Sequence, residues 1–402
     1  MNLIRKYLNL EYLLVGIQLF FSAVITFFHA SGWQFPFSVL LLFNSGIYFL
    51  LYGRRLRNIV RSPIGMTFFL LVVIIIISSA NYLYYDDLRG FLLHDANLFE
   101  LFSFSLIWAL NFFVIFIFSS GNKSLDLIKL FSWLFLVISI YANIRAYQYN
   151  RVLVGSQIQY HYYYYLVMII PLLILANKNS KIKYVFILIA LVATVFSFKR
   201  MGIFIGFLLI IFNIFYDLNT IPFRKKFQFI VFIILIISLV YMSLPQMQYE
   251  AERVLLRMSR LQDDAGSGRL DYAFDVLNNF SLNTAENKLI GNGFWSMYIE
   301  HKHFVDVEWA SMLHYFGIIG LSIYVLIHFL MIIRLSFLLK TNNIFFVSFL
   351  NFYIIFLLYS IATELFSYQY LSVPLFIYLG LMEGSIAKTY LKGKNNTNEM
   401  EF

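Results

Sequence analysis

Proton-transfer side chains gather in one short stretch of the sequence. His301, His303, Asp306 and Glu308 lie within "EHKHFVDVE", directly before a long apolar segment. A carboxylate or a neutral imidazole can take a proton from a hydroxyl group, which is the task of a general base. Two histidines two residues apart beside an aspartate are a weak pattern for metal ligands. We therefore expect this stretch to supply a general base, without a metal ion.

Two adjacent cations stand in an otherwise apolar stretch. Lys199 and Arg200 interrupt "VATVFSFKRMGIFIGFLL" with no acidic residue nearby. Because a charged side chain at the bilayer centre costs about 2.5–3.5 kcal/mol, we place them at a turn between two spans. One interpretation is that they extend towards lipid head groups. The interpretation we favour is that they bind an anion.

The one long polar segment, residues 244–305, carries a second group of cations. Its first part reads "LPQMQYEAERVLLRMSRLQ", in which Arg253, Arg257 and Arg260 recur at helical spacing beside an apolar face. This pattern is typical of an amphipathic helix at a membrane surface. Binding of a substrate by these arginines and a solvated basic face over anionic lipid both remain open.

Within the same segment, "GSGR" precedes another helical pattern. Leu270, Phe274 and Leu277 repeat with the period of a helix, so Ser267 is a candidate N-cap and Arg269 falls in the first turn. An arginine at the positive end of a helix is unfavourable for that helix. A bound anion would explain the arginine, because helix N-termini and glycine-rich turns offer free N–H groups.

These residues must be positioned by elements that are almost entirely apolar. Of the 402 residues, 61% are hydrophobic and only 13% are charged, against about 25% charged residues in a soluble domain. The composition predicts a polytopic membrane protein. The chain has no cysteine, which excludes disulfides and thiol chemistry. Its net charge of +9 fits basic cytoplasmic loops better than nucleic-acid binding.

Apolar runs long enough to cross a bilayer predict about twelve spans. They are expected at residues 11–29, 36–52, 64–80, 98–118, 125–143, 159–176, 182–197, 201–216, 227–243, 308–331, 343–360 and 367–386. Transporters show internal repeats, and we find no convincing repeat between the two halves.

The basic residues predict the orientation of these spans. In short loops, lysine and arginine are enriched on the cytoplasmic side. They concentrate in one set of alternate segments, which includes both termini, the run from Arg54 to Arg61, the run from Arg224 to Lys226, and Arg334 with Lys340. Both termini are therefore expected in the cytoplasm. Lys199, Arg200 and the long polar segment are expected on the opposite side.

In this order the local patterns resemble the O-antigen polymerase (Wzy) and O-antigen ligase superfamily. The resemblance covers about residues 145–330. It rests on the turn "KRMG", with Lys199 in place of the usual Ser, and on "GSGR" followed by a helix and the turn "GNG". It rests further on Asp306, eleven residues before Gly317 of "GIIGL", and more weakly on "RVLVGSQIQYHYYYYLVMIIPLL". Ligases usually carry His-Asn where this chain has Asp306 and Val307, which favours a polymerase.

The resemblance implies a metal-independent glycosyltransferase with a GT-C-like helical fold and no cofactor. Such an enzyme transfers a sugar chain en bloc from undecaprenyl diphosphate to the next lipid-linked repeat unit, outside the bacterial inner membrane. Asp306 or His303 would be the base, with Glu308 ranked third. Arg200 and Arg269 would hold the leaving diphosphate.

Further substrate-binding candidates are Lys199, Arg145, Arg151, Arg253, Arg257, Glu308 and His301. The implied partners are the lipid-linked oligosaccharide donor and acceptor, membrane lipid and a chain-length regulator protein. The expected organisation is spans one to nine in residues 1–243, an extracytoplasmic catalytic loop in 244–307, and the last three spans with a cytoplasmic tail in 308–402. An O-antigen ligase and a lipid-linked oligosaccharide flippase are the alternatives.

Overall fold

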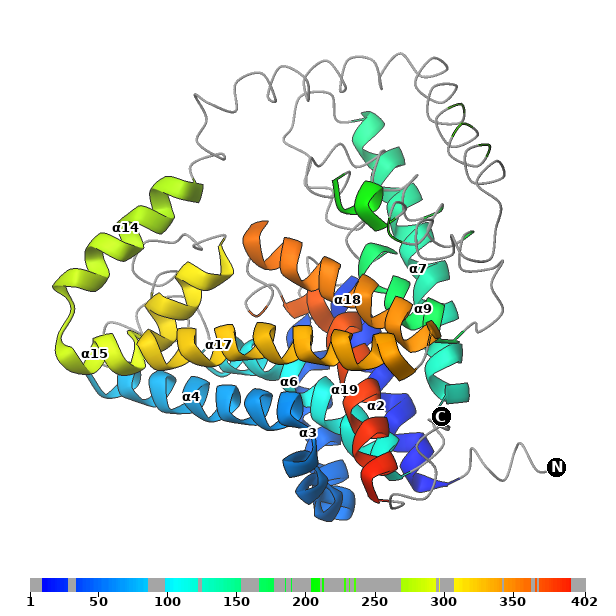
Figure 1. Ribbon diagram of the computed structural model, residues 1–402, viewed down its shortest axis with the longest axis horizontal. Helices are drawn as coiled ribbons and strands as arrows, with labels where there is room; N and C mark the ends of the chain where they lie inside the picture. The colour runs from blue at the N-terminus through cyan, green and yellow to red at the C-terminus, as the bar shows by residue number, and fades with distance from the viewer. Residues whose placement is uncertain are drawn as a thin grey trace.

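The computed structural model of the protein describes residues 9–27, 34–85, 98–121, 125–152, 166–176, 204–209, 269–293, 307–341, 343–362 and 369–391, and a few isolated positions that include 296 and 366. These residues are almost entirely helical (Figure 1). The prediction of an all-α protein is thus confirmed for this part of the chain.

The helices keep the order that the apolar runs predict. They are α2 (Leu10–Phe27), α3 (Gln34–Tyr52), the 3-10 helix η1 (Gly53–Arg61), α4 (Pro63–Tyr85), α6 (Leu98–Gly121), α7 (Leu125–Val152), α9 (Ile170–Ala176), α14 (Arg269–Leu282), α15 (Ala285–Ile290), α17 (Glu308–Thr341), α18 (Asn343–Ala362) and α19 (Gln369–Leu391).

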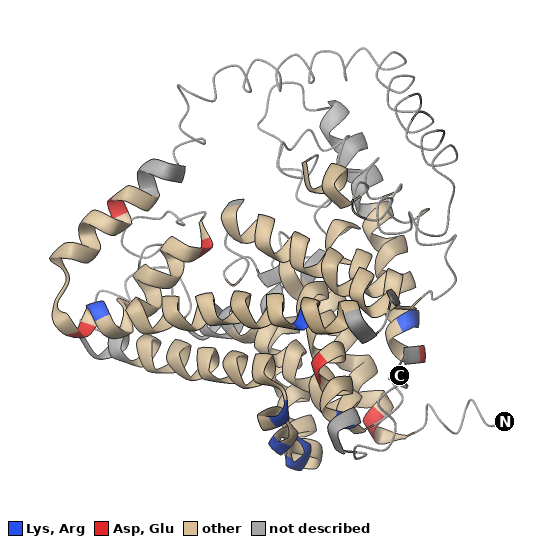
Figure 2. Ribbon diagram, in the orientation of Figure 1, with Lys and Arg blue, Asp and Glu red and all other residues tan. Residues whose placement is uncertain are grey.

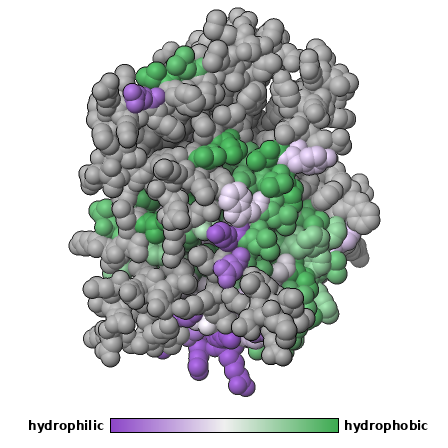
Figure 3. Space-filling view, turned by 90° about the vertical axis from the view of Figure 1, so that its right-hand side faces the viewer, coloured by the Kyte–Doolittle hydropathy of each residue, from purple (hydrophilic) through white to green (hydrophobic). Residues whose placement is uncertain are grey.

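Four helical stretches are long and apolar enough to cross a membrane. They are Pro36–Arg61, Pro63–Ala80, Glu308–Leu339 and Ile344–Ile361. Shorter apolar helices cover Leu10–Ile25, Leu106–Gly121 and Leu166–Ala176. The chain therefore has the helical character of a membrane protein. A broad hydrophobic area covers the described surface on one side of the molecule, and a hydrophilic group projects at its lower edge, at the height of η1 (Figure 3).

Small residues bring α19 and α6 into close contact. A Cβ added to Gly380 would lie 2.5 Å from the carbonyl oxygen of Phe112, and one added to Gly384 would lie 2.1 Å from Ser119 Oγ. Helices in membranes pack through such small residues because the hydrophobic effect does not drive them together in lipid. These glycines place α19 at the centre of the bundle.

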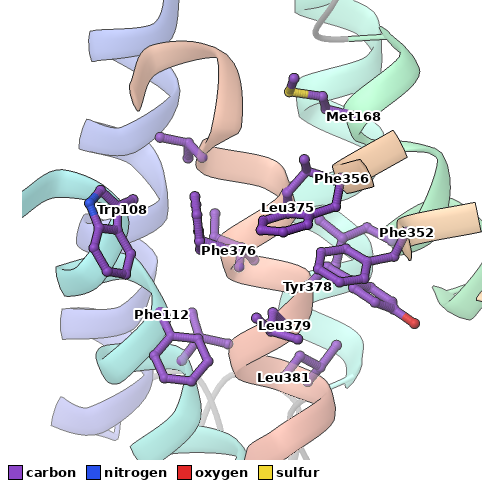
Figure 4. Packing of buried hydrophobic residues seen from close by; sticks show 14 of the residues in the cluster. Trp108, Phe112, Met168, Phe352, Phe356, Leu375, Phe376, Tyr378, Leu379 and Leu381 are labelled. Atoms are coloured by element: carbon purple, nitrogen blue, oxygen red, sulfur yellow. The ribbon is translucent and has the colours of Figure 1, made fainter. Parts of the chain in front are cut away.

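Aromatic rings fill the space around α19 (Figure 4). Trp108 of α6 contacts Phe376 of α19 at 5.0 Å between ring centroids, and Phe352 of α18 contacts Tyr378 at 5.1 Å. Phe366, from the connection between α18 and α19, lies 4.9 Å from Trp108 in an edge-on arrangement. This cluster joins three helices and one connecting segment.

A buried network of amides and hydroxyls holds α2, α3 and α6 together. Gln18 Nε2 donates to Asn111 Oδ1 at 3.3 Å, and Asn44 Nδ2 and Ser45 Oγ both donate to Gln18 Oε1. Ser22 Oγ donates to Asn111 Oδ1 at 2.6 Å. Interhelical hydrogen bonds of this kind stabilise helix packing where water is absent.

Two buried acids are each paired with an arginine. Glu383 of α19 accepts from Arg334 Nη2 at 2.9 Å and from Ser62 Oγ at 2.6 Å. Glu11 of α2 pairs with Arg55 of η1. Sequence analysis assigned Arg334 and Arg55 to basic loops. In the structure they neutralise carboxylates that would otherwise be unfavourable inside the bundle.

The helices α4 and α17 run antiparallel. Ser62, directly before α4, meets the Arg334–Glu383 pair, whereas Ser78 Oγ donates to the carbonyl oxygen of Tyr315. The charged residues of η1 gather at the lower edge of the molecule in Figure 2. Along α4, about 24 Å separates Ser62 from Ser78. The two contacts therefore lie far apart along the bundle.

Several described helices extend beyond their predicted spans, and two of them carry arginines in the added part. α7 continues to Val152 and so carries Arg145 and Arg151 in its last turns. α17 continues to Thr341 and so carries Arg334. Apolar runs mark the lipid-spanning part of a helix, and a helix need not end where the apolar run ends.

Candidate functional site

The helix α17 is broken near its start. Gly317 has φ 64° and ψ −161°, which are not helical values, so residues 308–316 form a short first segment. The carbonyl oxygens of His314 and Tyr315 accept from the backbone N–H groups of Asn292 at 2.9 Å and Gly293 at 3.1 Å. A break inside an apolar helix is tolerated when protein groups satisfy the freed backbone. Here the turn "GNG" provides them.

Glycines allow the turn "GNG" and the break at Gly317 to lie in close contact. Gly291 has φ 81°, and a Cβ there would lie 2.2 Å from the carbonyl carbon of Tyr315. A Cβ at Gly317 would lie 2.4 Å from the carbonyl oxygen of Leu289. Gly293, with φ 98°, also requires a backbone that favours glycine. The tight turn that the sequence predicts at "GNG" is confirmed, and it fits into the break at Gly317.

His314 connects the same turn to the first segment of α17. Its Nε2 lies 3.0 Å from Ser296 Oγ, and its Nδ1 lies 3.5 Å from Asn292 Nδ2. Which ring nitrogen donates depends on the tautomer of His314. These contacts join the turn to the first segment of α17.

Glu308 opens α17 and is buried. Phe366 donates its backbone N–H to Glu308 Oε2 at 3.4 Å. Phe366 belongs to the connection between α18 and α19 and is itself buried in the aromatic cluster. A carboxylate in the first turn of a helix is stabilised by the helix dipole. The carboxylate of Glu308 is thus directed at the protein interior.

The helix α14 begins at Arg269, as the spacing of apolar residues predicts. It packs against α17, with Ala273 and Val276 buried. The side chain of Arg269 lies outside the described part of the structure, as does its candidate N-cap Ser267. The elements that carry Arg269 and Glu308 are therefore in contact with each other.

The other predicted site residues fall into two groups. Arg145 and Arg151 lie on α7, and their side chains are not among those described. Outside the described residues altogether are Lys199, Arg200, Arg253, Arg257, His301, His303 and Asp306. Among the described residues, no group of three or more His, Asp or Glu side chains could hold a metal ion.

Sequence analysis missed the residues that join the two motifs. Asn292, Ser296, His314 and Ser78 are polar residues next to a glycine turn or within apolar runs, without a chemical pattern of their own. The available signal was the placement of His314 three residues before Gly317. A polar residue beside a glycine in a span indicates a possible break with a partner.

The chain was compared with known proteins. No protein-family model matches it, and no curated protein matches it significantly.

Proposed function

We propose that the protein is a polymerase of O-antigen or another surface polysaccharide. It joins oligosaccharide repeat units linked to undecaprenyl diphosphate, on the outer face of the bacterial cytoplasmic membrane. The proposal includes about twelve spans, both termini in the cytoplasm, and residues 244–307 as the extracytoplasmic catalytic loop.

One observation carries this proposal. The turn "GNG" that follows the helix of Arg269 fits into the break of α17 at Gly317. These are two of the sequence patterns on which the resemblance to the O-antigen polymerases rests. The turn and the break are separate in sequence, but they form one structural unit. This supports the view that the patterns did not arise by chance in an apolar chain.

The proposed reaction assigns a role to each group. A hydroxyl of the acceptor unit attacks the anomeric carbon of the donor chain, and the bond from that carbon to the diphosphate oxygen breaks. Asp306 takes the hydroxyl proton, or His303 does. Arg200 and Arg269 stabilise the negative charge that develops on undecaprenyl diphosphate, for which the planar guanidinium fork is well suited. Lys199, Arg145 and Arg151 guide the lipid or the sugar.

The test is deletion of the gene, followed by electrophoresis of the surface polysaccharide. Single repeat units on the surface are the expected result, with polymer restored by the intact gene. Arg200→Ala should fail to restore polymer at a normal protein level, and Arg200→Lys should be poor because lysine lacks the fork.

Other outcomes identify the alternatives. Polymer that accumulates on its lipid carrier would identify a ligase, and complete loss of surface repeats would identify a flippase. Polymer of normal length from the Arg200→Ala variant would remove Arg200 from the site.

A further inference from the structure

Two helices outside the long spans expose large apolar side chains. On α14 these are Phe274, which is 61% exposed, Leu277 and Leu282, which is 84% exposed. On α15 it is Leu289. A group of exposed large apolar residues on neighbouring elements marks a surface that contacts something apolar.

The exposed residues of α14 divide by chemistry around the helix. Ala273 and Val276 form the buried face that packs towards α17. At about 100° per residue, Phe274 and Leu277 fall on one flank of that face. Exposed Asp275 and Asn279 fall on the other flank, and Leu282, the last residue of the helix, lies on the side of Asp275. A helix with one apolar and one polar flank fits a boundary between lipid and water.

The position of α15, near the end of α4 opposite η1, agrees with a boundary between lipid and water. The exposed arginines of η1 lie directly before Ser62, and Ser78 lies about 24 Å further along α4. Since the hydrocarbon core is about 30 Å thick, Ser78 and η1 belong to opposite halves of the bilayer. Ser78 bonds to Tyr315, on which the turn after α15 packs.

The apolar surface of α15 continues that of a membrane span. The backbone of Leu289 lies against Gly317, and the next residues of α17, Ile318 and Ile319, are exposed. On a spanning helix, exposed apolar residues face lipid.

We infer that α14 and α15 form an interfacial hairpin seated on the lipid bilayer. Phe274, Leu277 and Leu289 lie among the upper parts of the acyl chains, while Asp275 and Asn279 face water. The hairpin anchors one end of the polar segment to the bilayer beside the break in α17. This inference concerns lipid contact alone and does not depend on the proposed reaction.

The chain lends itself to a direct test because it has no cysteine. The full-length protein carries one new cysteine in each variant, labelled with an environment-sensitive nitrobenzoxadiazole dye and reconstituted in vesicles of phosphatidylethanolamine and phosphatidylglycerol. Phe274→Cys and Leu277→Cys report on the apolar residues. Asp275→Cys and Asn279→Cys are the matched controls on the same helix, and Val325→Cys on the exposed surface of α17 is the lipid-facing reference.

Two quenchers distinguish the environments. A nitroxide placed high on the lipid acyl chain should quench the dye at positions 274 and 277 at least twofold more than at 275 and 279. Iodide in the water should show the reverse order. All four positions are exposed, so the variants should fold, and 274 and 277 give independent readings.

Two results would overturn the inference. If iodide quenches 274 and 277 as strongly as 275 and 279, the apolar residues face water. If neither quencher reaches 274 and 277, protein covers them, either another segment of the chain or a second copy.

Discussion

The proposed reaction requires a general base, for which the candidates are Asp306, His303 and Glu308. Glu308 is buried and its carboxylate accepts from the backbone of Phe366. That contact suits a role in holding the connection between α18 and α19. It supports the order in which Asp306 and His303 precede Glu308 as candidates.

Asp306→Asn keeps the shape of the side chain and removes its basicity. If Asp306 is the base, turnover should fall by about 10²–10⁴-fold, with binding of the lipid-linked donor retained. His303→Gln should have a milder effect. Turnover of synthetic lipid-linked repeat units by purified protein measures both variants. An active Asp306→Asn protein beside an inactive His303→Gln protein would assign the role to His303.

The buried pair of Arg334 and Glu383 should matter for stability. Glu383→Gln leaves Arg334 without its counter-charge, which we expect to cost about 3 kcal/mol of unfolding free energy. This is the low end of the range for broken buried pairs, because the arginine stem can extend towards water. Denaturation of the micelle-bound protein by sodium dodecyl sulfate measures the change.

The matched double variant separates charge from packing. Arg334→Met together with Glu383→Gln removes both charges and should recover most of the lost stability. Arg57→Met, at an exposed arginine of η1, should stay within about 0.5 kcal/mol of the wild type. A double variant as unstable as Glu383→Gln would show that the loss comes from packing.

At the scale of the helices, we expect the break at Gly317 to hold the end of the polar segment against α17. Gly317→Ala adds a Cβ against the carbonyl of Leu289 at a positive φ. An L-residue at φ 64° and ψ −161° costs roughly 1–3 kcal/mol before the collision is counted. We expect the turn "GNG" to detach from α17, so that proteases cleave residues 244–307 faster than in the wild type.

The control for this prediction is Gly46→Ala in α3. A Cβ at Gly46 meets no atom within 4 Å, so the helix should be unaffected or slightly more stable. Equal cleavage rates in the Gly317→Ala variant and the wild type would mean that the break does not hold the segment.

The sequence predicts that α4 is a helix, but it does not predict the break in α17. An apolar run in a membrane must form a helix to satisfy its backbone, so the run at 64–80 was enough to predict α4, found at Pro63–Tyr85. The break at Gly317 was not predictable in the same way. Apolar residues flank this glycine on both sides, and the groups that satisfy its neighbours come from a distant turn.

At the candidate site, too, local features could be predicted from the sequence and contacts between distant residues could not. The start of α14 at Arg269 follows from local spacing and was predicted. The contacts of Ser78 with Tyr315 and of Arg334 with Glu383 join residues far apart in sequence, 237 and 49 positions respectively. Hydropathy and local motifs carry no information on such pairs. Arg334 was therefore counted among loop cations although its guanidinium is buried.

For the chain as a whole, the orientation in the membrane decides which side η1 and α15 face. The arginines of η1 lie at one end of α4, and α15 packs near its other end. Because arginine in short loops favours the cytoplasmic side, η1 should face the cytoplasm and α15 the outside. The proposed substrates would then reach the face that carries α15.

Single cysteines at the two ends test this orientation in intact cells. Glu286→Cys on α15 should react with a membrane-impermeant maleimide added from outside, because Glu286 is exposed in the first turn of this short helix. Arg57→Cys in η1 should react only after the inner membrane is permeabilised. Both residues are exposed, so a difference in labelling reports the side of the membrane and not burial. The reverse pattern would place the loop in the cytoplasm, where an enzyme that acts on extracytoplasmic lipid-linked sugars could not use it, and the proposed polymerase would then be wrong.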